Sequence, residues 1–157
     1  LKIGDQKLYV SKEYLAVLSP VFEAMFFRDF AENGKEEVEL KDVEYGEFVD
    51  LLHLIYHDTM VITDCTVLHI LKLSDQFQIE KILEHAKKHL TQSSTIDTLT
   101  KLLAADRYGI TDLKEHCLDS FTTVTELEKM QKCPEYDSFS AEMKSAICYR
   151  IAKLKLG

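Results

Sequence analysis

The spacing of apolar residues changes along the chain, and this change restricts the possible folds most strongly. Alternate residues are apolar in Lys7–Val10 and again in Val38–Leu40, as in half-buried strands. From Tyr45 onward, apolar residues recur at helical spacing. Short strands interleaved with helices and followed by helices alone predict an α+β domain with a helical tail.

Capping residues place the starts of several helices. Ser11 suits an N-cap for a helix through about Val17. Ser19 can cap a second helix over Val21–Phe27, because Pro20 fits the first helical position.

Two later helices are predicted to begin near Thr63 or Asp64 and near Ser138 or Ser140. Between them the chain echoes itself, since Ser74–His85 resembles Ala105–His116. Both segments contain an aspartate, an aromatic residue and an isoleucine before an amphipathic helix. The echo predicts stacked helix-turn-helix hairpins.

The net charge and the cysteine content limit the classes of partner and the cellular compartments that fit the chain. The formal net charge of −8 argues against nucleic acid, because binding to phosphates requires clustered Lys and Arg. The chain contains no C-x-x-C motif, and its four cysteines are scattered. That pattern favours a reducing compartment, the cytoplasm or the nucleus. No stretch is apolar enough to span a membrane.

The histidines do not indicate an active site. His53 and His57, and likewise His85 and His89, stand four residues apart, but neither pair has the H-E-x-x-H order or an evident third ligand. We therefore expect no enzyme activity, no catalytic or metal-binding residues and no cofactor.

The segment Leu8–Phe27 closely resembles the opening of the BTB/POZ fold, through its Ser-Pro-x-Phe at 19–22 and its Met-Phe end. Val38–Val43 and Leu54–Tyr56 continue the resemblance. It implies a small three-stranded sheet flanked by helical hairpins over residues 1–92. Residues 93–157 would form an all-helical extension like a 3-box or BACK segment.

The chain is most similar to the MATH-BTB adaptors of the speckle-type POZ kind. Its opening reads as the middle of a strand, so we expect an upstream domain, and in such adaptors a MATH domain selects the client proteins. Many BTB proteins have His where this chain has Ser11. This departure weakens any transfer of the charged pocket of BTB zinc-finger repressors.

The resemblance implies binding to the N-terminal domain of cullin-3, the scaffold of a ubiquitin ligase. The family's cullin signature is a hydrophobic residue, any residue and then Glu after the second helix, and Phe30, Ala31 and Glu32 match it. An aromatic side chain could fill a partner pocket while a carboxylate accepts a charge-assisted hydrogen bond. Alternatively, Phe30 covers the domain's own core and Glu32 is solvated.

Two further sets of residues are implied by the resemblance. Residues 94–121 occupy the place of the 3-box, where Leu99, Leu102 and Leu103 would contact cullin-3 or form the extension's own core. Tyr14 and Leu18 would form a homodimer interface on the first helix, unless both pack internally. The rival hypothesis for the whole chain is a BTB oligomerisation scaffold that does not bind cullin.

Overall fold

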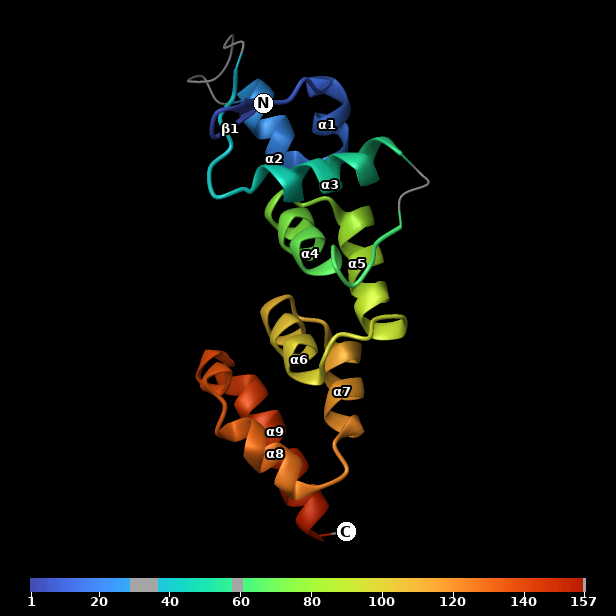
Figure 1. Ribbon diagram of the computed structural model, residues 1–157, viewed down its shortest axis with the longest axis vertical. Coiled ribbons are helices and arrows are strands. Elements are labelled where there is room, and N and C mark those ends of the chain that lie inside the picture. The colour runs from blue at the N-terminus through green and yellow to red at the C-terminus, as the bar shows by residue number, and fades with distance from the viewer. Residues whose placement is uncertain (29–36, 58–60, 157) are drawn as a thin grey trace. The chain divides into compact units, whose positions relative to one another are not determined.

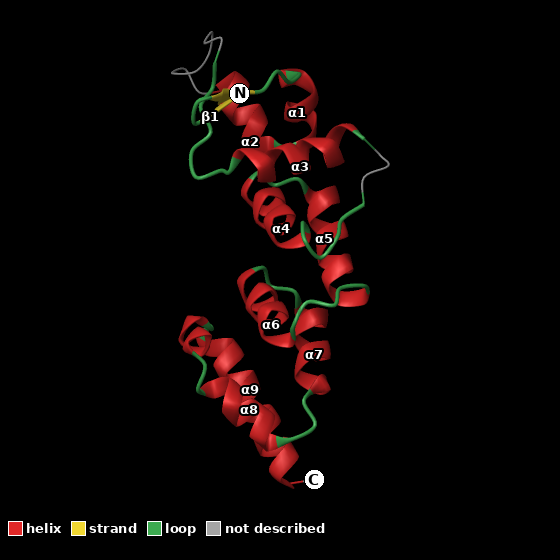
Figure 2. Cartoon of the chain, in the orientation of Figure 1, coloured by secondary structure: helices red, strands yellow, loops and turns green. Residues whose placement is uncertain are grey.

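The computed structural model describes residues 1–28, 37–57 and 61–156. Contacts divide the chain into two compact units, Leu1–His89 and Leu90–Gly157 (Figure 1). Short strands occur only near the start of the described chain, and helices dominate the rest (Figure 2). The α+β class with a helical extension is therefore confirmed.

The first unit combines a small β-hairpin with two short N-terminal helices, a π-helical turn and three longer helices. Its elements are β1 (Lys2–Ile3), β2 (Gln6–Lys7), α1 (Lys12–Leu18), α2 (Pro20–Glu23), η1 (Ala24–Arg28), α3 (Tyr45–Tyr56), α4 (Val67–Gln76) and α5 (Glu80–Gln92), the last of which extends past the unit's end.

The sheet is smaller than predicted. β1 and β2 pair antiparallel, with Lys2 opposite Lys7, and Lys2 also forms an isolated parallel bridge to Glu39. The Lys2 N–H donates to the Val38 carbonyl at 2.8 Å, and the Leu40 N–H donates to the Lys2 carbonyl at 2.8 Å. Among the described residues, the third segment therefore joins the sheet through one bridge. The strand predicted at 7–10 ends at Lys7, although exposure still alternates beyond it.

The predicted caps of the first two helices are confirmed. The Ser11 hydroxyl accepts a hydrogen bond from the Tyr14 N–H at 3.1 Å. The Ser19 hydroxyl accepts one from the Phe22 N–H at 3.1 Å and donates to the Phe77 carbonyl at 2.5 Å. Ser19 is 1% exposed, so both hydroxyl bonds satisfy polar groups that water does not reach.

Aromatic rings form the centre of the first unit. Phe22 stacks on Phe26 and on Phe77, with ring centroids 5.6 and 4.6 Å apart, and the edge of Phe48 meets Phe22 at 6.3 Å. Such pairs add about 0.5–1.5 kcal/mol each beyond the burial of their area. This cluster fixes α2 and η1 against α3.

The start of α4 differs from the prediction. Its N-cap is Thr66, because residues 63–66 form a turn in which the Val67 N–H donates to the Thr63 carbonyl at 2.8 Å. Asp64 instead pairs with His89 Nε2 at 2.8 Å. A turn closed by backbone bonds therefore replaces a side-chain cap at Thr63 or Asp64.

The internal echo corresponds to two hairpins with the same turn. Gln78 and Gly109 have positive φ angles of 51° and 62°. The Ile79 and Ile110 N–H groups donate to carbonyls five residues earlier, at 2.8 and 2.9 Å. Both turns thus end a helix with a Schellman-type arrangement and bury an isoleucine.

The second unit is helical throughout its described residues. Its elements are α6 (Thr98–Arg107), α7 (Thr111–Ser120), α8 (Val124–Gln131), the 3₁₀ segment η2 (Pro134–Ser138) and α9 (Ala141–Leu156). The side chains of Leu102, Leu113, Leu127, Met143 and Ile147 are fully buried. Helix α8 was not predicted from the sequence; it begins with a capping box between Thr123 and Glu126.

Side-chain bonds tie α9 to the preceding helices. The Ser140 hydroxyl accepts from the Met143 N–H at 3.1 Å, so Ser140 is the residue that caps α9. Asp106 of α6 accepts from the Ser140 N–H and hydroxyl at 2.7 and 2.5 Å. Arg150 donates to the carbonyls of Asp119 and Phe121 at 3.1 Å each, at the end of α7. A positive charge at this position interacts favourably with the negative end of the α7 helix dipole.

Candidate protein-interaction surface

The outer face of α1 presents apolar side chains to solvent. Leu15 is fully buried and anchors the helix, whereas Val17 is 84% exposed and Tyr14 is 44% exposed. Leu18 lies between these extremes. Because large exposed apolar groups that cluster mark interaction sites, this face is the strongest candidate surface among the described residues.

Tyr14 contacts residues of its own unit and is also partly exposed on the outer face of α1. Its ring lies against Tyr56 of α3, with centroids 5.3 Å apart, and its hydroxyl donates to the Ile55 carbonyl at 3.3 Å. The Tyr56 hydroxyl accepts from the Ser11 N–H at 3.3 Å. Tyr14 is thus held by contacts inside its own unit and is at the same time partly exposed to solvent. The interface role of Tyr14 and Leu18 stays a prediction.

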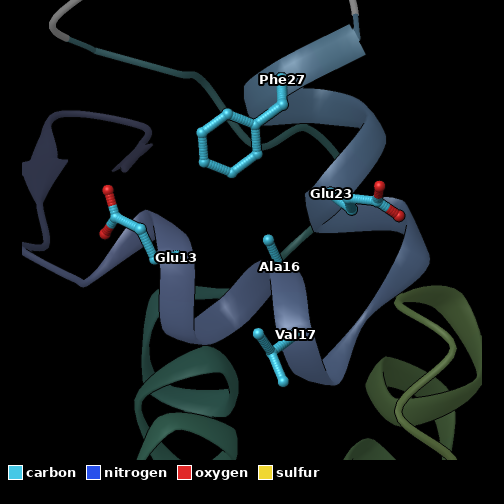
Figure 3. Close-up of a pocket in the computed structure, with 5 residues that line it drawn as sticks. All are labelled: Glu13, Ala16, Val17, Glu23 and Phe27. Carbon is cyan, nitrogen blue, oxygen red and sulfur yellow. The ribbon is translucent and has the colours of Figure 1, made fainter.

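A shallow hollow adjoins this face between α1 and the α2–η1 segment. Figure 3 shows side chains from both sides lining it. The lining residues are Glu13, Ala16, Val17, Glu23 and Phe27. Phe27, at 49% exposed, and Val17 are its largest apolar groups. The hollow could accept an apolar side chain from another molecule.

Two carboxylates flank the hollow. Hydrogen bonds from its own backbone N–H and from the Ser11 hydroxyl hold the pKa of Glu13 below its usual range. Glu23 pairs with Arg28, with Oε1 and Nη2 2.8 Å apart. Two carboxylates therefore border the apolar floor, and one of them is paired with a cation.

The hollow was not predicted from the sequence. Val17 lies two positions from the buried Leu15 and so faces roughly the opposite side of α1, a spacing that could have identified it. Phe27 gave no such signal, because the second helix reads as apolar nearly all round. The π-helical turn Ala24–Arg28 rotates Phe27 out of the position that a regular helix would give it.

The predicted cullin-contact residues are divided between two regions. Phe30, Ala31 and Glu32 lie outside the described residues, in the segment that comes after Arg28. In α6, Leu99 and Leu103 are partly exposed, whereas Leu102 is fully buried. The burial of Leu102 favours the alternative that it belongs to the core of the extension.

Clusters of metal ligands and membrane-spanning helices were also sought among the described residues. Within it, no three His, Cys, Asp or Glu side chains gather as a potential metal site. His69 Nε2 pairs with Asp50 Oδ2 at 2.9 Å, a contact that joins α4 to α3. None of the described helices combines the length and the apolar character required to cross a bilayer.

The first unit combines a small β-hairpin with a buried aromatic helix that begins at Ser-Pro and with later helices. This combination is typical of one class of protein-interaction domain, and comparison with known families identifies that class. The BTB/POZ domain profile matches residues 1–94, and the chain belongs to this family.

Several of the relatives carry BTB and MATH domains by name. The "BTB and MATH domain-containing protein 38" of Caenorhabditis elegans is 38% identical over 98% of this chain and 40% of its own length. Protein 36 of that series is 31% identical over 98% of this chain and 48% of its own length. "Kelch-like protein 40a" of Danio rerio is 34% identical over 70% of this chain and 18% of its own length.

The chain spans less than half the length of these curated relatives. The likeness to MATH-BTB proteins that the sequence predicted is confirmed. Family and relatives together support a protein-interaction adaptor.

Proposed function

We propose that this chain is a homodimeric substrate adaptor that recruits cullin-3 into a ubiquitin ligase. Phe30 and Glu32 would hold the N-terminal domain of cullin-3, and Leu99 and Leu103 would widen the contact. Clients would be selected by a domain outside residues 1–157.

One observation carries the cullin contact. The triplet Phe30-Ala31-Glu32 comes shortly after the α2–η1 segment in the sequence, where the family's cullin signature is expected, and the chain belongs to that family. A three-residue pattern has little weight elsewhere; here its weight comes from its place in the sequence of a BTB/POZ domain. The aromatic ring would supply buried contact area and the carboxylate a charge-assisted hydrogen bond.

Self-association would use the outer face of α1. A twofold interface repeats one patch against itself, so an apolar patch suffices. Tyr14 and Leu18 would contribute to it, and the 84% exposure of Val17 adds a residue that the same contact would cover.

Calorimetry with the isolated N-terminal domain of cullin-3 tests the cullin contact. We expect the parent chain to bind, and Phe30→Ala and Glu32→Ala each to weaken binding by about 1–3 kcal/mol, as interface hot spots do. Glu36→Ala is the matched control, since it removes a carboxylate from the same stretch of sequence but lies outside the signature.

The outcomes separate the two hypotheses. Unchanged binding by the Phe30→Ala/Glu32→Ala double variant would refute the assignment of the contact residues. If the parent chain itself does not bind, the rival hypothesis of an oligomerisation scaffold replaces the adaptor.

A further inference from the structure

Two histidines lie next to each other at the end of α3. His57, the C-cap residue, follows His53 by about one helical turn, and its backbone N–H donates to the His53 carbonyl at 2.8 Å. The centroids of the two imidazole rings are 6.0 Å apart, and the ring planes are inclined at 54°. Both residues are exposed, so both rings are accessible to a solute.

Neither ring of this pair is engaged elsewhere in the described part of the chain. The structure gives no hydrogen bond or ion pair from the His53 or His57 imidazole to any described residue. His85 and His89 of α5 have the same spacing, but His89 Nε2 pairs with Asp64 Oδ1 at 2.8 Å. Of these two pairs, therefore, only the pair on α3 has both rings available for a ligand.

The separation of the rings is close to that of two imidazoles bound to one metal ion. Imidazole nitrogen is a preferred ligand of Zn²⁺, Cu²⁺ and Ni²⁺, and two histidines four residues apart on a helix can bind the same ion. A zinc–nitrogen bond of about 2.0–2.1 Å and tetrahedral angles place the centres of two bound rings about 5 Å apart. Rotation of two exposed side chains is enough to bring the rings about 1 Å closer.

We propose that His53 and His57 form a two-ligand site for a divalent transition metal ion of the Zn²⁺ type, with water in the remaining coordination positions. The expectation of no metal-binding residues rested on the lack of a third protein ligand, and a cluster of three is indeed not found among the described residues. Two ligands supply roughly half the binding free energy of a four-ligand structural site, which corresponds to a Kd between about 1 and 200 µM for Zn²⁺.

A bound ion fastens the last turn of α3, because it links a residue inside the helix to its C-cap. That turn holds the start of α1: the Ile55 carbonyl accepts from the Tyr14 hydroxyl, and the Tyr56 hydroxyl accepts from the Ser11 N–H, each at 3.3 Å. Metal binding therefore stabilises the first unit. The site depends neither on cullin-3 nor on self-association, so its failure and that of the proposed function are separate results.

Calorimetric titration of the parent chain with ZnCl₂ tests the site. Loss of even an outer partner of a metal ligand typically weakens binding by about 10–100-fold, so His53→Gln and His57→Gln should each weaken it by about tenfold or more. His85→Gln is the matched control, because it removes an exposed histidine from the engaged pair, and it should bind like the parent. MgCl₂ should give no binding, since Mg²⁺ prefers oxygen ligands.

Thermal unfolding provides the second measurement. A ligand of the folded chain raises the unfolding midpoint, so ZnCl₂ should raise it for the parent and for His85→Gln by more than for the His53→Gln/His57→Gln double variant. Binding that persists in the double variant reports other groups, such as the exposed thiols of Cys65 and Cys148. The proposal is refuted if the parent binds Zn²⁺ no more tightly than about 1 mM, or if the double variant binds as tightly as the parent.

Discussion

Asp97, the residue before α6, shows how one carboxylate supports a helix end. Its Oδ1 accepts from the Thr100 N–H at 2.9 Å, and its Oδ2 accepts from the Thr100 hydroxyl at 2.7 Å. These bonds, the backbone one first, lower the pKa of Asp97. The folded state therefore favours the ionised carboxylate more than the unfolded state does.

We expect Asp97→Ala to lower the free energy of unfolding by about 1 kcal/mol at neutral pH, as the loss of an N-cap does. Because the folded-state pKa is depressed, the ionised cap stabilises the fold fully above the unfolded value of about 4, and this contribution is lost as pH falls through the folded pKa. Urea unfolding at neutral pH and near pH 3 measures the difference.

Asp97→Asn serves as the control for that experiment. An amide oxygen can still accept from the Thr100 N–H, so this variant should keep most of the stability at neutral pH and lose the acid-dependent part. An equal loss for Asp97→Ala at both pH values would contradict the role assigned to the charge.

At the scale of elements, the two equivalent turns offer a matched comparison. Gln78 adopts a left-handed conformation at the position that Gly109 occupies in the second hairpin. That conformation costs a residue with a Cβ about 1–2 kcal/mol, against about 0.5–1 kcal/mol of extra entropy that glycine loses on folding.

We therefore expect Gln78→Gly to raise the free energy of unfolding by about 0.5–1 kcal/mol, and Gly109→Ala to lower it by a similar amount. No atom lies within 4 Å of a Cβ built on Gly109, so the second change isolates the backbone effect. Gln76→Gly, in the last turn of α4, is the control and should destabilise, because glycine is a poor helix former. Stabilisation by both glycine substitutions would point to a cause other than the turn.

The elements that were predictable were those with local signals. Ser11 and Ser19 identified α1 and α2, since an N-cap acts within four residues of chain. The spacing of Thr123 and Glu126 matches a capping box and is a local signal for the start of α8. Alternation predicted a strand at Val38–Leu40, but the structure has only the bridge of Lys2 to Glu39 there, because the extent of pairing depends on residues far apart in the chain. The pairing of Asp64 with His89, which occupies a predicted cap of α4, is likewise long-range and is not encoded by local patterns.

The candidate surface was predictable only in part for the same reason. Family resemblance led to Tyr14, but its division between an internal contact with Tyr56 and exposure to solvent depends on where α3 lies. Phe27, which lines the hollow, belongs to the π-helical turn Ala24–Arg28, and the apolar spacing of the second helix does not indicate such a turn. Helical spacing alone did not distinguish the buried Leu102 from the partly exposed Leu99 and Leu103, because that difference depends on how α6 packs.

At the scale of the whole molecule, the first unit depends on its aromatic cluster. Phe22 is fully buried and contacts the rings of Phe26, Phe48 and Phe77. We expect Phe22→Ala to lower the free energy of unfolding by about 3–5 kcal/mol, which is a large share of the roughly 5–15 kcal/mol that stabilises a typical domain. Phe27→Ala, at a half-exposed position, is the control and should change the stability of the monomer by about 0.5 kcal/mol or less. Urea unfolding monitored by tyrosine fluorescence measures both, and similar losses for the two would contradict this account of the core.

The contacts of Ser19 explain why the Ser-Pro-x-Phe motif is a guide to the fold. Its hydroxyl starts one helix and at the same time secures the carbonyl of Phe77, far along the chain, in a place sealed from water. The serine of the Ser-Pro-x-Phe motif is therefore a structural residue that links the start of α2 to the end of α4. A match to Ser-Pro-x-Phe at these positions therefore reports how a chain folds and gives no information about the molecules that it binds.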